Sequence, residues 1–304
     1  MATAPAHGGD AVRLRRLEKP EEFRGLEELE RAAFELSDES PTPLPIQRAI
    51  QDQGGLVLGA FADVYLVGFS IGFLGWDGEK LYHYSHRTAV RPEYRNHRVG
   101  FRLKSFQRDE VLKQGLSQIR WVIDPLQSRS AMLTLRRLGA RLNGYKVHYL
   151  GQRSNGLDRG LETDRATVVW EISDKSVEER IAGRYPTAGD DEARHRRSSA
   201  IVTTAVGDTG LRVPIEVAEP TGGWAHLEIP FDLALVRDHA PDTLRTWRHA
   251  TRDGFRAAFD LGYDVEDFAT VSLEHERRSF YLLRKAEPPI APAPGAPRAV
   301  MKIE

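Results

Sequence analysis

The residues best suited to chemistry lie between Tyr82 and Lys104, where the sequence reads YHYSHRTAVRPEYRNHRVGFRLK. The first part favours a strand that ends near Val90, because Pro92 has no amide hydrogen to continue the pairing. A short basic loop follows, and apolar spacing from Val99 then predicts a helix to about Lys113. The first amides of a helix are unpaired and carry partial positive charge, so this order of elements predicts a site for phosphate oxygens.

Side chains within this stretch add to that prediction. Arg95, His97 and Arg98 would bring cationic donors to the same place, and Gly100 would let a ligand approach the backbone closely. Strand alternation predicts two faces for residues 82–90. One face would carry Tyr84, His86 and Thr88, and the other His83, Ser85 and Arg87.

The loop resembles a known signature. Val90-x-Pro92-x-Tyr94-Arg95-x-x-Arg98-Val99-Gly100 is similar to the pyrophosphate-binding motif of the GNAT superfamily of N-acyltransferases, whose core is Arg/Gln-x-x-Gly-x-Gly/Ala. Arg98 departs from that core because it occupies the first glycine position. The segment from Ser130 to Ala140 resembles the second GNAT motif. The string WVIDPLQSRSAMLTLRRLGA is closer still to a subfamily of predicted GNAT acetyltransferases with a C-terminal extension.

The resemblance implies acetyl-CoA or another acyl-CoA as co-substrate, and no metal. It also implies that two strands, ending near Val90 and Ile123, splay apart to admit pantetheine, and that an amine attacks the thioester directly. The residues it assigns to the co-substrate are Ala89, Val90, Arg95, Asn96, His97, Arg98, Val99, Gly100 and Ser130.

The resemblance also implies which residues could act as acid and base. The register puts Tyr84 and His86 on the acceptor side, and His86 is the better candidate base because its reference pKa lies near neutrality; a histidine hydrogen-bonded within the sheet is the other reading. The family's general acid falls at Leu135, so that function is absent or moved, and Tyr145 is the replacement considered. Asp124 would hold the acceptor ammonium or cap a turn.

Composition narrows the function classes. Lys plus Arg total 43 against 44 Asp plus Glu, and this balance argues against a nucleic-acid partner. The chain has no cysteine, which excludes disulfides and a cysteine nucleophile and fits a reducing compartment. The sequence shows no secretory signal and no apolar run of membrane-spanning length. We therefore expect a cytoplasmic protein without a membrane partner; a homo-oligomer remains open.

The pattern of elements predicts five segments: a tail over 1–10, a GNAT-like acyl-CoA-binding domain over 11–151, a linker over 152–163, a C-terminal α/β domain over 164–286 and a Pro-rich tail over 287–304. The charged segment AGDDEARHRRSS in the fourth predicts an exposed loop. Both larger segments end in a helix, Leu-Gly, a tyrosine and a strand, so the second is interpreted as a degenerate copy of part of the first. The fold class expected is mixed α/β, with a mostly antiparallel GNAT-like sheet flanked by helices and a smaller C-terminal α/β domain.

Two functions follow from these observations. The first is an N-acyltransferase that moves an acetyl or other short acyl group, succinyl included, from CoA to the amine of a small molecule such as an amino acid. The second is a CoA-binding regulatory or scaffold module with weak catalysis, supported by Leu135 and by Arg98 in a glycine position.

Overall fold

The computed structural model describes residues 12–36, 41–151, 153, 158–273 and 275–286, so the two predicted tails lie outside the described residues. The strands are β1 (Val12–Arg16), β2 (Leu56–Ala62), β3 (Tyr65–Trp76), β4 (Leu81–Val90), β5 (Gln118–Ile123), β6 (Arg141–Lys146), β7 (Arg165–Glu171), β8 (Ser199–Ala200), β9 (Val202–Val206), β10 (Arg212–Val217), β11 (Trp224–Ile229), β12 (Tyr263–Leu273) and β13 (Glu276–Lys285). The helices are α1 (Pro20–Phe34), α2 (Leu44–Asp52), α3 (Val99–Lys113), α4 (Ser128–Ala131), the π-helix η3 (Met132–Arg137), α5 (Lys175–Ile181), α6 (Ala188–Arg197), α7 (Leu233–His239) and α8 (Leu244–Asp260), with 3₁₀ turns η2 (Pro92–Tyr94) and η5 (Pro241–Thr243).

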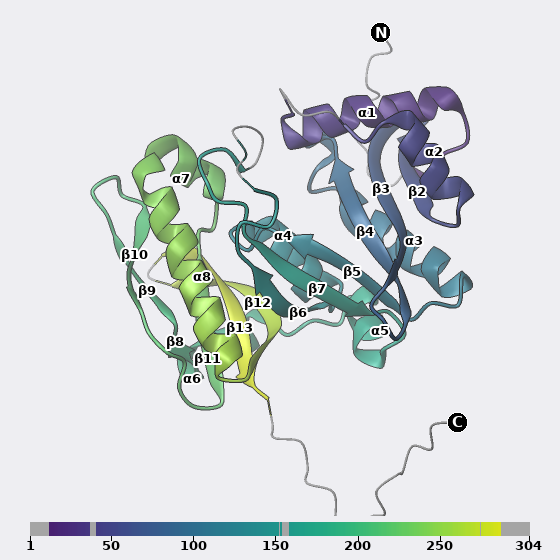
Figure 1. Ribbon diagram of the computed structural model, residues 1–304. Coiled ribbons are helices and arrows are strands. Elements are labelled where there is room, and N and C mark those ends of the chain that lie inside the picture. Colours follow the sequence, from purple (N-terminus) through teal and green to yellow (C-terminus); the bar gives the residue numbers. More distant parts are fainter. Residues whose placement is uncertain (1–11, 37–40, 152, 154–157, 274, 287–304) are drawn as a thin grey trace, which may run out of the picture.

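One sheet of eleven strands runs through the molecule in the order β1-β2-β3-β4-β5-β7-β6-β12-β13-β11-β8, and β9 and β10 form a separate hairpin (Figure 1). Neighbouring strands are antiparallel except for two parallel pairs, β4 with β5 and β8 with β11. The predicted fold class, a mixed and mostly antiparallel sheet flanked by helices, is confirmed. None of the helices in the described residues is long and apolar enough to cross a membrane.

Alternating residues of the strands direct apolar side chains to two layers of helices. On one face Val57, Phe69 and Ile71 pack with α1. On the other face Leu56 and Leu58 pack in the core that also contains α3, η3 and α8. The sheet is therefore covered on both sides where β2 to β4 lie. The ends of β4 and β5 form the edge at which a site can open.

The second half of the sheet repeats the connectivity of the first. β5, α4 with η3, β6 and β7 lie in the sheet order β5-β7-β6, and β11, α8, β12 and β13 lie in the order β11-β13-β12. Each set begins beside a parallel neighbour, β4 or β8. The two sets meet where Leu142 of β6 pairs with Val265 of β12. This repeated order agrees with the interpretation of the second region as a degenerate copy.

The sheet is continuous across the predicted linker. β7 follows that segment in sequence, yet it pairs with β5 on one side and β6 on the other. Of the linker residues that the structure describes, Asp158 pairs with Arg165, and the Thr163 hydroxyl donates to the carbonyl of Gly151. The strand that completes the first half of the sheet is therefore supplied from beyond the linker.

The loop predicted at AGDDEARHRRSS is wrong, because most of this segment forms α6. Thr187 caps the helix, and its amide donates to the carboxylate of Asp190 in a capping box. The buried residue of α6 is Asp191, which forms an ion pair with Arg136. Because the buried face carries a carboxylate in place of apolar side chains, helical periodicity of hydrophobic residues could not reveal this helix.

A buried ion pair joins the second half of the chain to the first. Arg248 on α8 is fully buried, and its Nη1 lies 2.8 Å from Oδ1 of Asp124, directly after β5. Burial acts to raise the pKa of Asp124, but the charge and hydrogen bond of Arg248 outweigh it, so this pKa lies below its ordinary value. The pair therefore contributes stability above the ordinary carboxyl pKa, which is lost as the pH falls through the lowered value.

We expect Arg248→Met to lower the free energy of unfolding at pH 7 by about 3–5 kcal/mol, because it leaves the Asp124 carboxylate buried and unpaired. Adding Asp124→Asn should restore part of this loss. Denaturant titration of the single and double variants measures both effects. A single variant as stable as the parent would show that the pair does not hold α8 to β5.

Candidate active site

The parallel strands β4 and β5 are joined over a very short stretch. The paired residues are His83 with Ile119 and Tyr84 with Arg120. Beyond them β4 continues to Val90 beside β3, and β5 continues to Ile123 beside β7. In the described residues these two ends have no strand between them. The predicted separation of the strands is confirmed, because the ladder between β4 and β5 stops at Tyr84 and Arg120. We call the region between the two diverging strand ends the V.

A β-bulge lies at the apex of this V. Ser85 pairs with Gly72 and Arg87 with Ile71, so His86 is the extra residue of β4. The Lys104 ammonium on α3 donates to the Ser85 hydroxyl, whereas Arg87 forms an ion pair with Glu30 on α1. The bulge therefore reverses the alternation of the strand. The prediction that Arg87 shares a face with His83 and Ser85 is wrong, because a strict two-residue period cannot accommodate the inserted residue.

The loop after β4 leaves main-chain donors without an intrahelical acceptor. Arg102 donates the first intrahelical bond of α3, to the carbonyl of Arg98 at 2.9 Å. The amides of Val99, Gly100 and Phe101 come before that bond and lie in the first turn, where no intrahelical acceptor is within reach. Arg98 has φ 59° and so adopts the left-handed backbone that the resemblance assigns to a glycine. The main chain therefore keeps the glycine-like turn although Arg98 stands in the glycine position of the motif.

Gly100 has no role that the folded protein itself explains. A Cβ placed there would lie 3.7 Å from Val90 and 3.8 Å from Leu133, which are ordinary contacts. Its φ is not in the left-handed region, and alanine is favoured over glycine in a helix by about 1 kcal/mol. The position lies where β4, α3 and η3 meet. A glycine that neither packing nor backbone requires fits the close approach of a ligand.

The cationic side chains of the loop are arranged around this turn. Arg95 folds back, with its Nε donating to Val90 O and its Nη2 to Ala33 O, both at 3.3 Å. The guanidinium of Arg98 lies 5.2 Å from the Phe101 ring centroid. His97 is exposed to solvent. The loop is therefore positively charged. The predicted residues Asn96 to Gly100 form the end of this loop and the start of α3, and Ser130 lies on α4, which leads into η3.

Aromatic residues surround the predicted base. The Phe73 ring centroid lies 5.4 Å from that of Tyr84 and 6.0 Å from that of His86. The His86 ring remains accessible to solvent, yet its neighbours remove enough hydration, helped by the charge of Arg87, to lower its pKa below the ordinary value. Burial, assisted by Tyr149, raises the pKa of Tyr84 to about 12. At neutral pH this site therefore contains a neutral imidazole and a protonated phenol.

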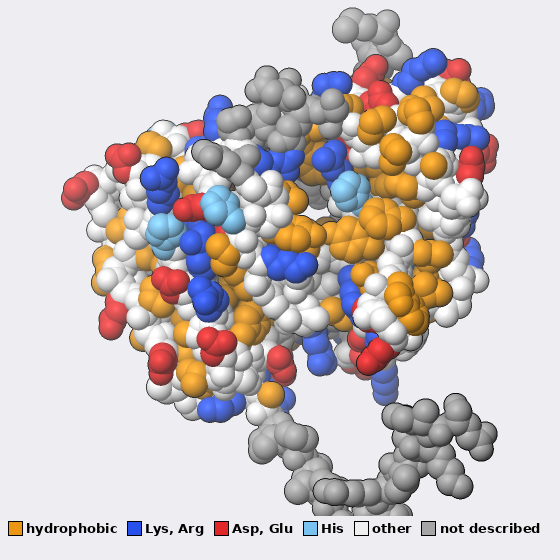
Figure 2. Space-filling model, viewed as in Figure 1, with side chains coloured by type: hydrophobic (Ala, Val, Ile, Leu, Met, Phe, Trp, Pro, Cys, Tyr) orange, Lys and Arg blue, Asp and Glu red, His pale blue; other side chains and the backbone are white. Residues whose placement is uncertain are grey.

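The hairpin of β3 and β4 exposes apolar side chains on both of its faces. Phe73, Leu74 and Trp76 at the end of β3 and Leu81 at the start of β4 are exposed. In Figure 2, hydrophobic side chains lie over the part of the molecule where Figure 1 draws β3 and β4, with a histidine at their margin. Of these, Phe73 shares the face of Tyr84 and His86, because it pairs with Tyr84. Leu74, Trp76 and Leu81 lie on the opposite face, where Leu74 pairs with His83.

Tyr145 and Asp124 lie together, apart from His86. Ile123, Ala166 and Tyr145 are opposite one another on β5, β7 and β6, so Tyr145 is two strands from the V. Its hydroxyl donates to Asp164 at 2.9 Å, and burial raises the pKa of the Tyr145 phenol well above its ordinary value. Asp124 accepts from Arg248 through Oδ1. Both residues are therefore engaged in a buried polar cluster with α8.

The structure also brings forward residues that sequence reasoning missed. Leu135 is fully buried in the core, so no acid stands at that position. Lys104 and Gln107 are buried beneath the apex of the V, on the face of α3 that carries Val99, Leu103 and Val111. A lysine and a glutamine on the buried face of an amphipathic helix were the signal that could have identified them, because such groups are buried only with partners.

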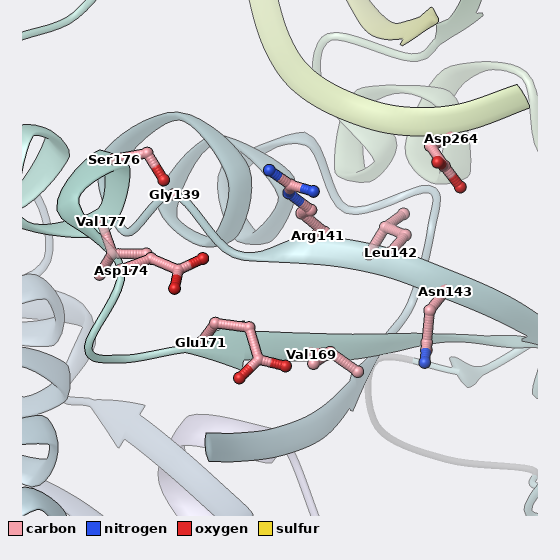
Figure 3. A pocket seen from close by; sticks show the side chains of 10 residues that line it. All are labelled: Gly139, Arg141, Leu142, Asn143, Val169, Glu171, Asp174, Ser176, Val177 and Asp264. Carbon is pink, nitrogen blue, oxygen red and sulfur yellow. The ribbon is translucent and has the colours of Figure 1, made fainter. Parts of the chain in front are cut away.

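An open hollow of about 240 Å³ lies elsewhere, along β6 and β7. Figure 3 shows Glu171, Asp174 and Asp264 among its lining side chains, with Arg141 on its β6 wall. None of the predicted site residues lines it. It is therefore separate from the V between β4 and β5.

Comparison with known proteins identifies the segment that holds the V. Residues 23–140 match the family model described as "Acetyltransferase (GNAT) family". This segment belongs to the GNAT family. The GNAT acetyltransferase domain thus includes α1, the strands β2 to β5, the basic loop, α3 and η3. No curated protein matches the chain.

Solved structures similar to the chain include several acetyltransferases. The ribosomal-protein-S18-alanine N-acetyltransferase from Escherichia coli is 16% identical, with a TM-score of 0.43, over 54% of this chain and 95% of its own. The protein yncA from Salmonella typhimurium, solved with acetyl-CoA, is 17% identical, with a TM-score of 0.45, over 54% and 95%. Aminoglycoside 6'-acetyltransferase type Ii is 18% identical, with a TM-score of 0.43, over 54% and 99%.

We expect Gly100→Ala to leave the fold intact, with an unfolding free energy unchanged or raised by up to about 1 kcal/mol. Its CoA affinity should fall by about 10–100-fold, the range that corresponds to loss of a hydrogen bond to a charged group. Calorimetry with CoA measures the affinity. Gly25→Ala on α1 is the matched control, because a Cβ there meets nothing within 4 Å. Unchanged affinity in Gly100→Ala would remove this turn from the CoA site.

Proposed function

We propose that the protein is an acyl-CoA-dependent N-acyltransferase that acts on the amine of a small molecule. The observation that carries this proposal is the parting of β4 and β5 next to the unpaired amides at the start of α3. An extended ligand can pair with the free strand edges in the V while its phosphates meet the positive end of a helix. Acyl-CoA is a ligand with both parts.

The donor would be held mainly by main chain. The amides of Val99, Gly100 and Phe101 would bind the diphosphate, and Arg95, His97 and Arg98 would add positive charge around it. The free edge of Ala89 and Val90 would pair with the pantetheine. Ser130 would contact the donor from α4, across the same opening. Bound acyl-CoA supplies a thioester with an electrophilic carbonyl carbon.

His86 would act as the base for the acceptor. The bulge projects it beside the apex of the V, and its lowered pKa keeps the imidazole neutral at pH 7. A neutral imidazole can accept a proton from an attacking amine, directly or through water. Tyr84, whose raised pKa keeps its phenol protonated, would donate a hydrogen bond to the acceptor or donor.

The acceptor would reach His86 over the face of β3 and β4 that carries Phe73 and Tyr84. A small amine with an apolar portion, an amino acid among them, suits the aromatic surroundings of His86 better than a polyanion does. Acetyl is the acyl group that the GNAT acetyltransferase match favours, with succinyl as a further candidate.

Binding and turnover can be measured separately. Calorimetry with acetyl-CoA and with desulfo-CoA tests the donor site, and release of free thiol in the presence of a panel of amines tests transfer. We expect binding of both ligands and amine-dependent thiol release. Binding without release on any amine would instead favour the CoA-binding scaffold, for which buried Leu135 in the acid position is the supporting observation.

We expect His86→Gln to lower kcat by about 100–10,000-fold while the Kd for CoA stays unchanged, because the base touches the acceptor and not the diphosphate. In the parent protein activity should fall as the pH drops through the His86 pKa, which lies below the ordinary value of 6.5. That limb of the pH profile should be absent from the variant. His239→Gln, at an exposed position on α7, is the control. A variant with the parent's pH–rate profile would exclude His86 as the base.

A further inference from the structure

A lysine lies buried directly beneath the apex of the V. Lys104 on α3 is 4% exposed. Its Nζ donates to the Ser85 hydroxyl at 2.9 Å and to Oε1 of Gln107 at 2.8 Å. The same nitrogen lies 4.0 Å from the Trp121 ring centroid and 6.0 Å from that of Trp170. The ammonium therefore bridges the two parted strands, through Ser85 on β4 and Trp121 on β5.

The surroundings of Lys104 make the ammonium easy to deprotonate. The titratable side chain packed beside it is His83 on β4, bound to Gln107 at 3.1 Å. Burial, assisted by the charge of Lys104, lowers the pKa of His83 to about 3, so this imidazole is neutral and adds no charge beside the ammonium. Gln107, Trp121 and Trp170, on α3, β5 and β7, do not titrate. Burial alone lowers the pKa of Lys104 to about 7.

Transfer of an acyl group from a thioester needs a proton at the departing sulfur. When the C–S bond breaks, the electron pair goes to sulfur, and the thiolate must be protonated or stabilised. The position where the family resemblance puts the acid is Leu135, a buried hydrocarbon. Lys104 and Leu135 belong to the same face of the sheet, since α3 and η3 pack into one core.

We propose that Lys104 supplies the leaving-group proton through the hydroxyl of Ser85. The amine nitrogen forms a bond to the thioester carbonyl carbon, and the C–S bond breaks with its electrons on sulfur. Sulfur takes the Ser85 hydroxyl proton, Ser85 takes a proton from Nζ of Lys104, and Lys104 becomes neutral. The extra proton of the amine leaves through His86. Lys104 regains its proton through Ser85 after CoA departs.

The inference rests on the proposed acyl transfer. It predicts that Lys104 adds a separate limb to the pH dependence of kcat. A proton donor must be in its acid form, so kcat of the parent should fall as the pH rises through about 7, the value to which burial lowers the Lys104 pKa. The base His86 produces the opposite limb. Together they predict a bell-shaped profile whose upper limb belongs to Lys104.

The test compares three substitutions with two acyl donors. Lys104→Met keeps the length and volume of the chain without a proton, Lys104→Arg keeps a charge that cannot dissociate near neutrality, and Ser85→Ala removes the relay. Lys113→Met, on the same helix with a side chain 71% exposed, is the matched control. The donors are acetyl-CoA and an acetyl thioester of a more acidic thiol, whose departure needs no proton.

We expect Lys104→Met, Lys104→Arg and Ser85→Ala each to lower kcat with acetyl-CoA by about 100–1,000-fold, with the Kd for CoA unchanged. With the acidic thioester the loss should shrink to roughly tenfold or less, because the better leaving group departs unprotonated. The upper pH limb should disappear from the Met variant. Lysine-selective NMR of the ligand-free protein should show one lysine titrating near neutrality, and this signal should be missing from Lys104→Met.

Several results would overturn the proposal. Parent-like kcat in Lys104→Met, full activity in Lys104→Arg, or an equal loss with both thioesters would each show that Lys104 does not supply the proton. A lysine that titrates near its ordinary pKa would do the same. If the parent protein itself transfers no acyl group to any amine, the proposed function fails, and the NMR titration still reports on the buried lysine.

Discussion

The candidate site depends on two parallel strands, β4 and β5, that pair over two residues and then separate. Parallel pairing of β4 with β5 stops after Tyr84 and Arg120, where the bulge at His86 turns β4 away. Strand ends that leave backbone groups unpaired are costly when they are buried, unless a ligand or water completes them. The extra residue in β4 lies where the pairing with β5 stops, directs His86 to one face and leaves Ser85 on the other, above Lys104.

The second half of the chain holds the far wall of this opening in place. β5 is bounded on its other side by β7, which comes from beyond the predicted linker, and its end is fixed by the ion pair of Asp124 with Arg248 on α8. Tyr145, Asp164 and Arg252 extend the same buried polar cluster. The second half of the chain thus has a physical role, since it supports the strand against which the V opens.

Buried charges in this protein fall into two groups. Arg136 is matched by the carboxylates of Asp191 and Asp267, and Arg248 by Asp124, so these cations are compensated where they lie. Lys104 has hydroxyl, amide and aromatic partners instead, none of them anionic. An uncompensated ammonium in the interior lowers stability, and it loses its proton readily. That combination is what distinguishes a proton donor from a structural ion pair.

Much of the candidate site follows from local sequence. Alternation predicts the strand to Val90, the missing amide hydrogen predicts the break at Pro92, and apolar spacing predicts the helix from Val99 to Lys113. Each of these signals acts over a few residues, and the structure has all three elements. The position of Gly100 in the first turn of that helix follows in the same way. Tertiary structure decided the rest. Four features depend on partners distant in the chain, and no local periodicity predicts them. They are the inserted residue at His86, the ammonium beneath Ser85, the pairing of Asp124 with Arg248 and the helical form of residues 188–197.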